Sequence, residues 1–208
     1  GDGAAYAAAD GMMELRRLAV YCGSASPDDP LYLDTAREVG RTLARRGIGV
    51  VYGGGRLGLM GAVADAALME GGEVIGVIPE ALVRAELAHR GLTELHIVPD
   101  MHSRKALCTS LSDGFVTLPG GVGTMDELWE ALSWAQLGYH AKPVGLLNAG
   151  GYYDQLIAFQ QHMTTTGFVR PGHAAMLIAR DTLPLLLDAM EQHEPPEPLI
   201  GEALHRRD

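Results

Sequence analysis

The sequence predicts a three-layer α/β/α fold in which a doubly wound parallel sheet lies between two layers of helices. Short apolar runs alternate with helical patterns along the 208 residues, and this alternation is typical of parallel strands joined by right-handed helical crossovers. Glycine-rich turns at 53–58 and 119–123 each follow one of the apolar runs. In open parallel sheets ligands bind beyond the carboxyl ends of the strands, where we expect both turns to lie.

The expected elements follow one another in a regular order. Each predicted strand is a short apolar run bounded by turn residues, at 18–22, 48–52, 73–78, 95–98, 115–118, 143–147 and 175–178. Helical patterns occur at 32–46, from the first glycine turn to about 71, and at 101–110, 125–138, 152–165 and 182–190. The segment 80–91 is charged and has no clear period. Because no repeat or low-complexity linker divides the chain, we expect one domain at 15–192, a flexible leader at 1–14 and a tail at 193–208.

The composition limits the classes of partner. The chain is 47% apolar and 20% charged and has a net charge of −10, which disfavours broad binding to nucleic acid or to a membrane, since both attract positive surfaces. No stretch is long and apolar enough to span a bilayer, and the leader lacks the basic start of a signal peptide. Cys22 and Cys108 form no redox or metal motif, and the histidines show no metal spacing. We therefore expect a reduced, cytoplasmic setting and no metal.

The stretch 112–127 carries the strongest chemical signal. Its apolar run 115–118 fits a strand covered on both faces, Pro119 ends the run, and three of the next four residues are glycines. Thr124 could cap the following helix, with Glu127 as its partner in a capping box. Unpaired N–H groups at such a helix start attract an anion, most often phosphate. Glu127 could therefore be only a capping residue, or could also point towards the ligand.

Two further motifs are weaker. The glycines of 53–58 match the GxGxxG pattern of dinucleotide sites, but they follow the second strand, and Glu80 lies at a stretched distance for the expected acidic partner. We therefore favour plain turn glycines, or one wall of the same crevice, over an NAD site. Arg104 and Lys105 stand at a helix start just before the stretch 112–127, where they could be solvated cations or ligand contacts.

The predicted helix 125–138 is apolar on more than one side. One stripe contains Leu128 and Leu132, whereas Trp129 and Trp134 occupy other faces. A helix that covers a single sheet needs only one apolar stripe. A homodimer would bury the surplus; the alternative is a helix enclosed between the sheet and a long loop.

Several motifs match one known family in combination. They are Cys-Gly-Ser at 22–24, the glycine turn 52–61, Met-His-Ser-Arg-Lys at 101–105, Pro-Gly-Gly-Val-Gly-Thr-Met-Asp-Glu at 119–127, and the segments 134–138 and 142–145. Together they resemble the CGS, YGGGxxGLMG, MHxRK and PGGxGTxxE elements of the LOG ("Lonely Guy") family, the cytokinin riboside 5′-monophosphate phosphoribohydrolases. The similarity covers roughly 18–188 and is far more specific than a single glycine turn.

The resemblance implies a Rossmann-like fold, usually dimeric. It implies hydrolysis of the N-glycosidic bond of adenine-type nucleoside 5′-monophosphates to free base and ribose 5-phosphate, with no metal or redox cofactor. Arg104 and Glu127 match the family's catalytic pair. The positions that match its substrate contacts are Glu86, Lys105, Gly120, Gly121, Val122, Gly123, Thr124, Met125, Asp126 and Ser133. To these we add Ser24, as a further phosphate contact, and Gly54.

The chemistry of these residue types suits this reaction. Breaking a ribosyl C–N bond builds positive charge on the sugar. The carboxylate of Glu127 beside the anomeric carbon could stabilise that charge and align or deprotonate the attacking water. Arg104 could orient Glu127, hold the ribose or phosphate, or both, and Lys105 could bind or orient the substrate. We expect loop residues and a neighbouring subunit to complete the pocket that distinguishes prenylated from plain adenine.

Two alternative functions come from other classes. The first is a non-catalytic carrier or sensor of a phosphorylated nucleotide or cofactor, as in the molybdenum-cofactor carriers with Rossmann-like folds. The presence of both Arg104 and Glu127 argues against a carrier. The second is lysine decarboxylation, a label sometimes attached to the family; the chain has no recognisable pyridoxal-phosphate lysine motif, so this label finds no support in the sequence.

Overall fold

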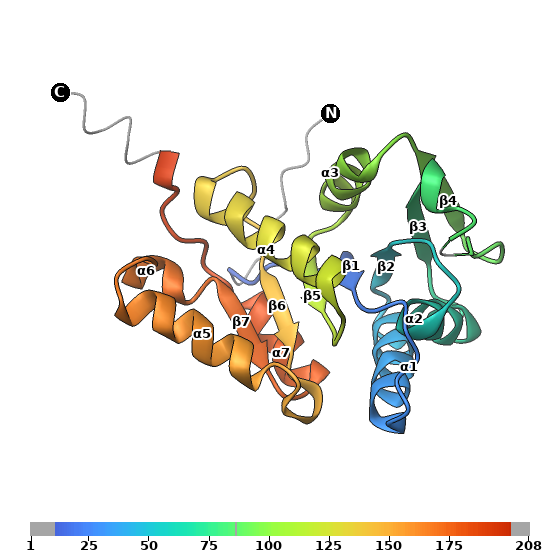
Figure 1. Cartoon of the computed structure of the whole chain (residues 1–208), viewed down its shortest axis with the longest axis horizontal. Helices are drawn as coiled ribbons and strands as arrows, with labels where there is room; N and C mark the ends of the chain where they lie inside the picture. Colours follow the sequence, from blue (N-terminus) through green and yellow to red (C-terminus); the bar gives the residue numbers. More distant parts are fainter. Residues whose placement is uncertain (1–10, 86, 201–208) are drawn as a thin grey trace.

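The computed structural model describes residues 11–85 and 87–200 and contains a seven-stranded parallel sheet in the order β4-β3-β2-β1-β5-β6-β7 (Figure 1). The strands are β1 (Arg17–Tyr21), β2 (Gly49–Tyr52), β3 (Val74–Pro79), β4 (Glu94–Val98), β5 (Gly114–Thr117), β6 (Val144–Leu147) and β7 (Leu177–Arg180). The helices are α1 (Pro30–Arg45), α2 (Gly58–Met69), α3 (Met101–Leu111), α4 (Val122–Leu137), α5 (Asp154–Thr165), α6 (Pro171–Ala174) and α7 (Leu183–Glu191). Short 3₁₀ turns occupy η1 (Glu80–Leu82) and η2 (Ala149–Gly151).

Alternating side chains of each strand divide the core into two layers. On β1, Leu18 and Val20 pack with α1, α2 and α7, whereas Ala19 and Tyr21 pack with α4 and α5 on the opposite face. Both faces of the strand are apolar because both are covered, as parallel sheets require. The predicted three-layer, doubly wound α/β/α fold is confirmed.

The chain reverses its direction of winding between β1 and β5. It runs outward from β1 to β4, then returns to place β5 on the other side of β1 and continues to β7. Tyr21 and Thr117 are register partners at the carboxyl ends of the two central strands. The turns that follow contact each other, since the Gly23 amide donates to the Pro119 carbonyl at 3.1 Å. This switch point is where an open α/β sheet leaves a crevice for a ligand.

The element boundaries differ from the predicted ones by up to three residues. Helix α4 begins at Val122 rather than 125, and β7 lies at 177–180 rather than 175–178. The shift of β7 follows from α6, a short helix that Pro171 starts and that the sequence pattern did not predict. Within residues 11–85 and 87–200, no helix has both the length and the apolar content needed to cross a bilayer.

The described parts of the expected leader and tail contact the domain. The Met13 amide donates to the Glu191 carbonyl at 2.8 Å, and the Met13 side chain packs against the core. On the C-terminal side, the Glu197 carbonyl lies 3.0 Å from Nε2 of the buried His173. Pro198 packs on Gly138 at the end of α4.

Helix α4 uses its apolar faces in more than one way. Leu128 and Leu132 are buried against the sheet, as predicted. Trp129 lines a small cavity shared with α5 and α6, so these helices cover a second face. Trp134 lies edge-on to Tyr139, which is 68% exposed. Part of the surplus is therefore enclosed within the chain, and the Trp134 side remains open.

Candidate active site

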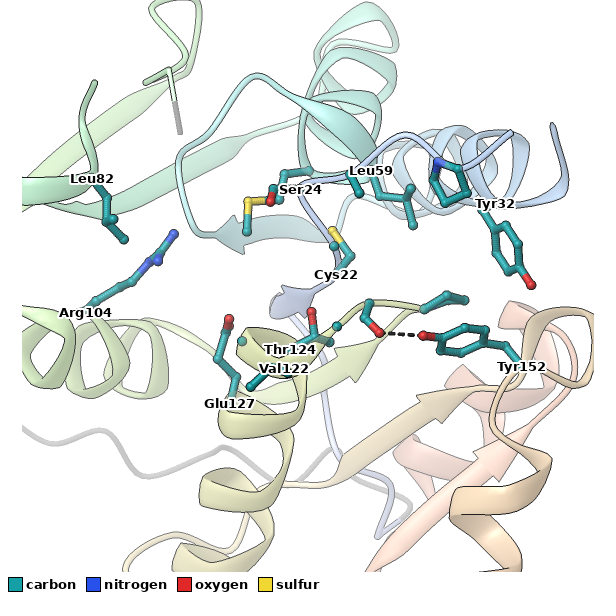
Figure 2. A pocket seen from close by; sticks show the side chains of 18 of the residues that line it. Cys22, Ser24, Tyr32, Leu59, Leu82, Arg104, Val122, Thr124, Glu127 and Tyr152 are labelled. Atoms are coloured by element: carbon teal, nitrogen blue, oxygen red, sulfur yellow. Dashed lines mark hydrogen bonds between the residues drawn. The ribbon is translucent and has the colours of Figure 1, made fainter. Parts of the chain in front are cut away.

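A cavity of about 480 Å³ opens at the switch point, beyond the carboxyl ends of β1 and β5 (Figure 2). Its wall combines the turn after β1, the start of α2, Leu82 of η1, the start of α3, the turn and first helical turns after β5, and Tyr152 before α5. This volume is within the usual range of small-molecule sites. The segments 22–24, 59–60, 101–104 and 119–127, which the sequence motifs include, all contribute to this one cavity.

The start of α4 presents an anion-binding surface to the cavity. Gly121 is the N-cap residue and has no side chain to bond the first amides of the helix. The first backbone bond runs from the Met125 amide to the Gly121 carbonyl at 3.1 Å. The N–H groups of the preceding helical residues therefore remain available, at the positive end of the helix dipole, to a ligand in the cavity.

The predicted capping box is wrong. Because α4 starts at Val122, Thr124 lies within its first turn and is buried, and Glu127 lies in the second turn. The glycine at 121 can adopt the cap conformation itself, which lets the helix begin one turn earlier than a threonine cap would allow. Glu127 is therefore not a reciprocal cap, and its side chain lines the cavity instead.

The three glycines at 120, 121 and 123 serve different purposes in this turn. A Cβ on Gly120 would lie 2.1 Å from Oγ1 of Thr124 and 2.9 Å from the Gly23 amide nitrogen, so packing requires glycine there. A Cβ on Gly121 or Gly123 would meet no protein atom within 4 Å. Both of these glycines line the cavity. They keep open the space in front of the helix start.

Arg104 is held rigidly at the edge of the cavity. Its side chain is only 4% exposed, with Nε donating to the Val77 carbonyl at 3.0 Å and Nη2 to the Gly53 carbonyl at 2.6 Å. Asp100 caps α3 by accepting from the Ser103 amide at 2.7 Å, which fixes the helix that carries the arginine.

This arrangement explains the first glycine turn. A Cβ on Gly53 would lie 2.0 Å from Nη2 of Arg104, and Gly54 has a φ of +78° and packs against Ile78 and Leu95. Neither Gly53 nor Gly54 lines the cavity. In this geometry the two glycines admit the buried guanidinium and the neighbouring strands, and the cavity wall on this side is formed by Leu59 and Met60.

Glu127 and Arg104 approach the same end of the cavity from α4 and α3, below Leu82 (Figure 2). Both charges act on the buried thiol of Cys108. Burial raises the pKa of Cys108 to about 12, the Glu127 carboxylate also raises it, and Arg104 lowers it. Burial likewise raises the pKa of Cys22, which lines the cavity. Neither cysteine is therefore a thiolate nucleophile at neutral pH.

Lys105 and Asp126 lie outside the cavity lining. Nζ of Lys105 pairs with Glu130 and, at 3.2 Å, with Asp126. The hydrogen bond that Lys105 donates to Glu130 is the main reason that the pKa of Lys105 is raised. These ion pairs tie α3 to α4 and so fix the spacing of the two helices that carry Arg104 and Glu127.

The remaining predicted positions are distributed around α4 and the loops. Ser24 and Val122 line the cavity with the glycine turn. Met125 packs against the core on the other side of α4. Ser133 is exposed and lines the separate cavity between α4, α5 and α6. Glu86 is outside the described residues.

Two tyrosines that were not among the predicted site residues support the glycine turn 119–123 through hydrogen bonds to the backbone at 118 and 120. Tyr152 Oη donates to the Gly120 carbonyl at 2.6 Å (Figure 2), and Tyr153 Oη donates to the Leu118 carbonyl at 2.5 Å. Asn148 accepts from the Tyr153 amide at 2.8 Å, which fixes the loop. The only sequence signal was the position of the Tyr-Tyr pair just after a strand and a glycine pair.

Replacing Tyr152 with phenylalanine should loosen the turn without unfolding the protein. Tyr152 is 44% exposed, so losing its hydrogen bond should lower the free energy of unfolding by only about 1 kcal/mol. Tyr153 is buried, and Tyr153→Phe leaves a buried carbonyl unpaired, at a cost of about 1–3 kcal/mol. Chemical denaturation measures both changes; an equal loss in the two variants would contradict this difference. A rise in KM for Tyr152→Phe at unchanged kcat would identify Tyr152 as a positioning residue.

The cavity has neither a metal-binding group among its described residues nor a lysine in its lining. Among residues 11–85 and 87–200, no group of three or more His, Cys, Asp and Glu side chains is arranged to hold a metal ion. The chain has two lysines, Lys105 and Lys142, and neither lines the cavity. A Schiff-base lysine needs a neutral amine next to its substrate, so neither lysine is placed for that chemistry in this cavity.

Comparison with known proteins shows the family. A family model described as "possible lysine decarboxylase" matches residues 60–190. A probable cytokinin riboside 5′-monophosphate phosphoribohydrolase of Oryza sativa subsp. japonica is 47% identical, over 86% of this chain and 79% of that protein. A cytokinin riboside 5′-monophosphate phosphoribohydrolase of Rhodococcoides fascians is also 47% identical, over 78% of this chain and 83% of that protein.

Solved structures show the same fold at lower identity. The molybdenum cofactor binding protein of Rippkaea orientalis superposes with a TM-score of 0.64, covering 85% of this chain and 95% of that chain. Its sequence is 19% identical to this one. That likeness supports the doubly wound architecture alone.

Proposed function

The chain belongs to the LOG family of cytokinin riboside 5′-monophosphate phosphoribohydrolases, and we propose how its cavity carries out that hydrolysis. The enzyme cleaves the N-glycosidic bond of N6-modified adenosine 5′-monophosphates, releasing the free base and ribose 5-phosphate. The observation that carries the proposal is that Glu127 and the uncapped start of α4 line one cavity. A carboxylate beside a phosphate site is what the reaction requires, and the shared lining supports this assignment.

In the proposed complex the 5′-phosphate binds at the turn 120–124. The available amides of α4 bond its oxygens, and the open space at Gly121 and Gly123 lets it approach the backbone. Ser24 lies in the facing turn and supplies a hydroxyl. The base then lies towards the apolar side chains of Leu82 and Met101, which line the same cavity.

The proposed chemistry uses Glu127 and Arg104 at the sugar. As the C1′–N bond breaks, positive charge develops on the ribose, and the nearby carboxylate stabilises it. Glu127 also accepts the proton of the water that attacks C1′, while the base leaves with its bonding electron pair and takes up a proton. Arg104, fixed by two backbone carbonyls, holds the carboxylate end of the cavity in place. No step draws on Lys105, which we assign to the α3–α4 ion pairs.

The function is tested by incubating the purified protein with AMP and with N6-isopentenyl AMP and separating the products by chromatography. We expect free base and ribose 5-phosphate, and the ratio of kcat/KM for the two substrates measures how far the cavity selects the N6 substituent. Binding of either nucleotide without release of base would instead support a carrier. Among the described residues no feature of the cavity favours a carrier over the hydrolase.

The phosphate position has its own test in Gly123→Ala. Within a helix this change gains about 0.5–1 kcal/mol of stability, because alanine has less backbone freedom than glycine in the unfolded chain. The new methyl meets no protein atom within 4 Å, so no clash offsets the gain. The methyl enters the space proposed for the phosphate, so we expect KM for AMP to rise at least tenfold. Gly172→Ala in α6, where a Cβ also meets nothing within 4 Å, is the matched control and should leave KM unchanged. An unchanged KM in Gly123→Ala would place the phosphate elsewhere.

We also propose a homodimer that completes the site. Ser133 lies six residues beyond Glu127 on α4, about 9 Å further along the helix axis, and does not line its own cavity. A substrate contact by Ser133 is therefore expected in the cavity of a second subunit. The exposed Tyr139 and the Trp134 side of α4 support such a contact. Size-exclusion chromatography with light scattering measures the molar mass and so tests the homodimer. A monomer at micromolar concentration would contradict the proposal.

The same proposal assigns the protein to the cytoplasm. Cys22 and Cys108 are both buried and unbridged, which suits a reducing compartment. Cell fractionation with an antibody to the native chain tests the location.

A further inference from the structure

A second concavity, of about 700 Å³, lies next to the candidate active site and is not used by the proposed function. It is formed between the turn 53–58 and the segment 80–91, and its lining includes Arg56, Arg84 and Arg90. Leu82, near the start of the same segment, lines the active-site cavity. The two hollows therefore share one loop.

The three arginines of this concavity differ from the paired arginines elsewhere in the described chain. In the part of the chain that the structure describes, no carboxylate forms an ion pair with any of them, whereas arginines elsewhere pair with Glu73, Glu38 and Glu70. The chain has 26 acidic and 16 basic residues, so partners are plentiful. Three arginines that line one hollow, with no ion-pair partner among the described residues, concentrate positive charge there.

Among the described lining residues, the carboxylate of Asp65 is already engaged. Asp65 accepts from Nε2 of His89 at 2.6 Å, and Nδ1 of His89 accepts from the Gly91 amide at 3.0 Å. Both ring nitrogens are thus committed. Asp65 is held by the histidine, and among the described residues it forms no ion pair with the arginines.

The backbone around the arginines is fixed. The Arg56 amide donates to the Leu87 carbonyl at 3.0 Å, and the His89 amide donates to the Gly54 carbonyl at 2.8 Å. Leu87 has a φ of 47°, a left-handed conformation that costs a non-glycine residue free energy and persists only where its surroundings impose it. These backbone hydrogen bonds join the turn 53–58 to residues 87–89 and so fix the backbone from which the arginine side chains extend.

We propose that this concavity binds a phosphorylated small molecule through a pyrophosphate-type group. The planar fork of arginine matches phosphate oxygens bidentately, and three such groups suit an anion with more than one phosphoryl unit. The volume fits a small molecule. An occupant would hold the segment 80–91 against the turn 53–58. Because Leu82 lines the active-site cavity and the Gly53 carbonyl holds Arg104, the occupied concavity and the active site are joined through the same two segments.

The test titrates inorganic pyrophosphate into the full chain by calorimetry at fixed ionic strength. The Glu127→Gln background, saturated with AMP, keeps the active-site cavity filled. We expect binding of one pyrophosphate, weakened at least tenfold in the double variant Arg84→Gln/Arg90→Gln, since charge-assisted bonds to two guanidinium groups are lost. The control Arg37→Gln/Arg41→Gln removes the same charge from α1 and should bind within twofold of the parent.

Two results would overturn the proposal: no pyrophosphate binding in the parent, or equal binding in the parent and the Arg84/Arg90 variant. Unchanged AMP affinity in that variant would separate the second site from the active site. Parallel titrations with ADP and with inorganic phosphate identify the source of the phosphoryl groups. Tighter binding of ADP indicates a nucleotide polyphosphate, and tighter binding of pyrophosphate indicates the free anion. These readouts do not depend on turnover, so failure of the proposed hydrolysis would be seen separately.

Discussion

Glu127→Gln should abolish turnover while leaving nucleotide binding nearly intact. The amide has the shape of the carboxylate but neither its charge nor its basicity, so it can neither stabilise the developing cation nor take a proton from water. General-base catalysis alone is worth about 10²–10⁴-fold, and loss of charge stabilisation adds to this. Turnover is measured by chromatographic assay of released base, and binding by calorimetry with AMP. Activity near that of the parent would remove Glu127 from the mechanism.

Asp126→Asn provides the matched control for this change. It converts the neighbouring carboxylate into an amide on the same helical turn, but Asp126 is outside the cavity lining and pairs with Lys105, which keeps its second partner Glu130. An exposed ion pair of this kind contributes about 0–1 kcal/mol. We therefore expect Asp126→Asn to retain turnover within about threefold. A loss as large as that of Glu127→Gln would mean that the charge of the helix start, rather than one carboxylate, governs the reaction.

The fold could be predicted from the sequence because it depends on local patterns. Apolar runs such as 18–22 and 115–118 are short and bounded by turn residues, and both are strands covered on two faces. The boundaries failed where a single residue decides them. Gly121 starts α4 before Thr124, and Pro171 begins a four-residue helix in what the pattern suggested was a loop.

The candidate site was predictable only where its functional groups lie within one short segment of the sequence. The turn 119–127 carries both the amides and Glu127, so a single motif located them. The role of Gly53 was not predictable, because glycine is needed there to make room for the guanidinium of Arg104, 51 residues away in the sequence. Tyr152 was missed for the same reason, since its hydroxyl supports a carbonyl 32 residues away. Sequence spacing gives no sign of such contacts unless the topology is already known.

Arg104→Lys should reduce both stability and turnover, because the guanidinium serves two buried carbonyls at once. Nε and Nη2 donate to Val77 and Gly53 from a side chain that is 4% exposed. A lysine keeps the charge but cannot reach both acceptors in one plane. Leaving a buried acceptor unpaired costs about 1–3 kcal/mol, and we expect turnover to fall at least 100-fold at a temperature where the variant is folded. Arg17→Lys, at a half-exposed ion pair with Glu73, is the control and should retain turnover.

Gly53→Ala separates position from charge in the same interaction. The new methyl would lie 2.0 Å from Nη2 of Arg104, and since this atom is the end of a flexible side chain, the guanidinium should move while the backbone stays in place. The arginine and its charge are then retained but displaced from the Gly53 carbonyl. If Arg104 acts by holding the carboxylate end of the cavity in place, Gly53→Ala should lower kcat much as Arg104→Lys does, with a smaller loss in denaturation midpoint. Normal kcat in Gly53→Ala would show that the charge matters and its position does not.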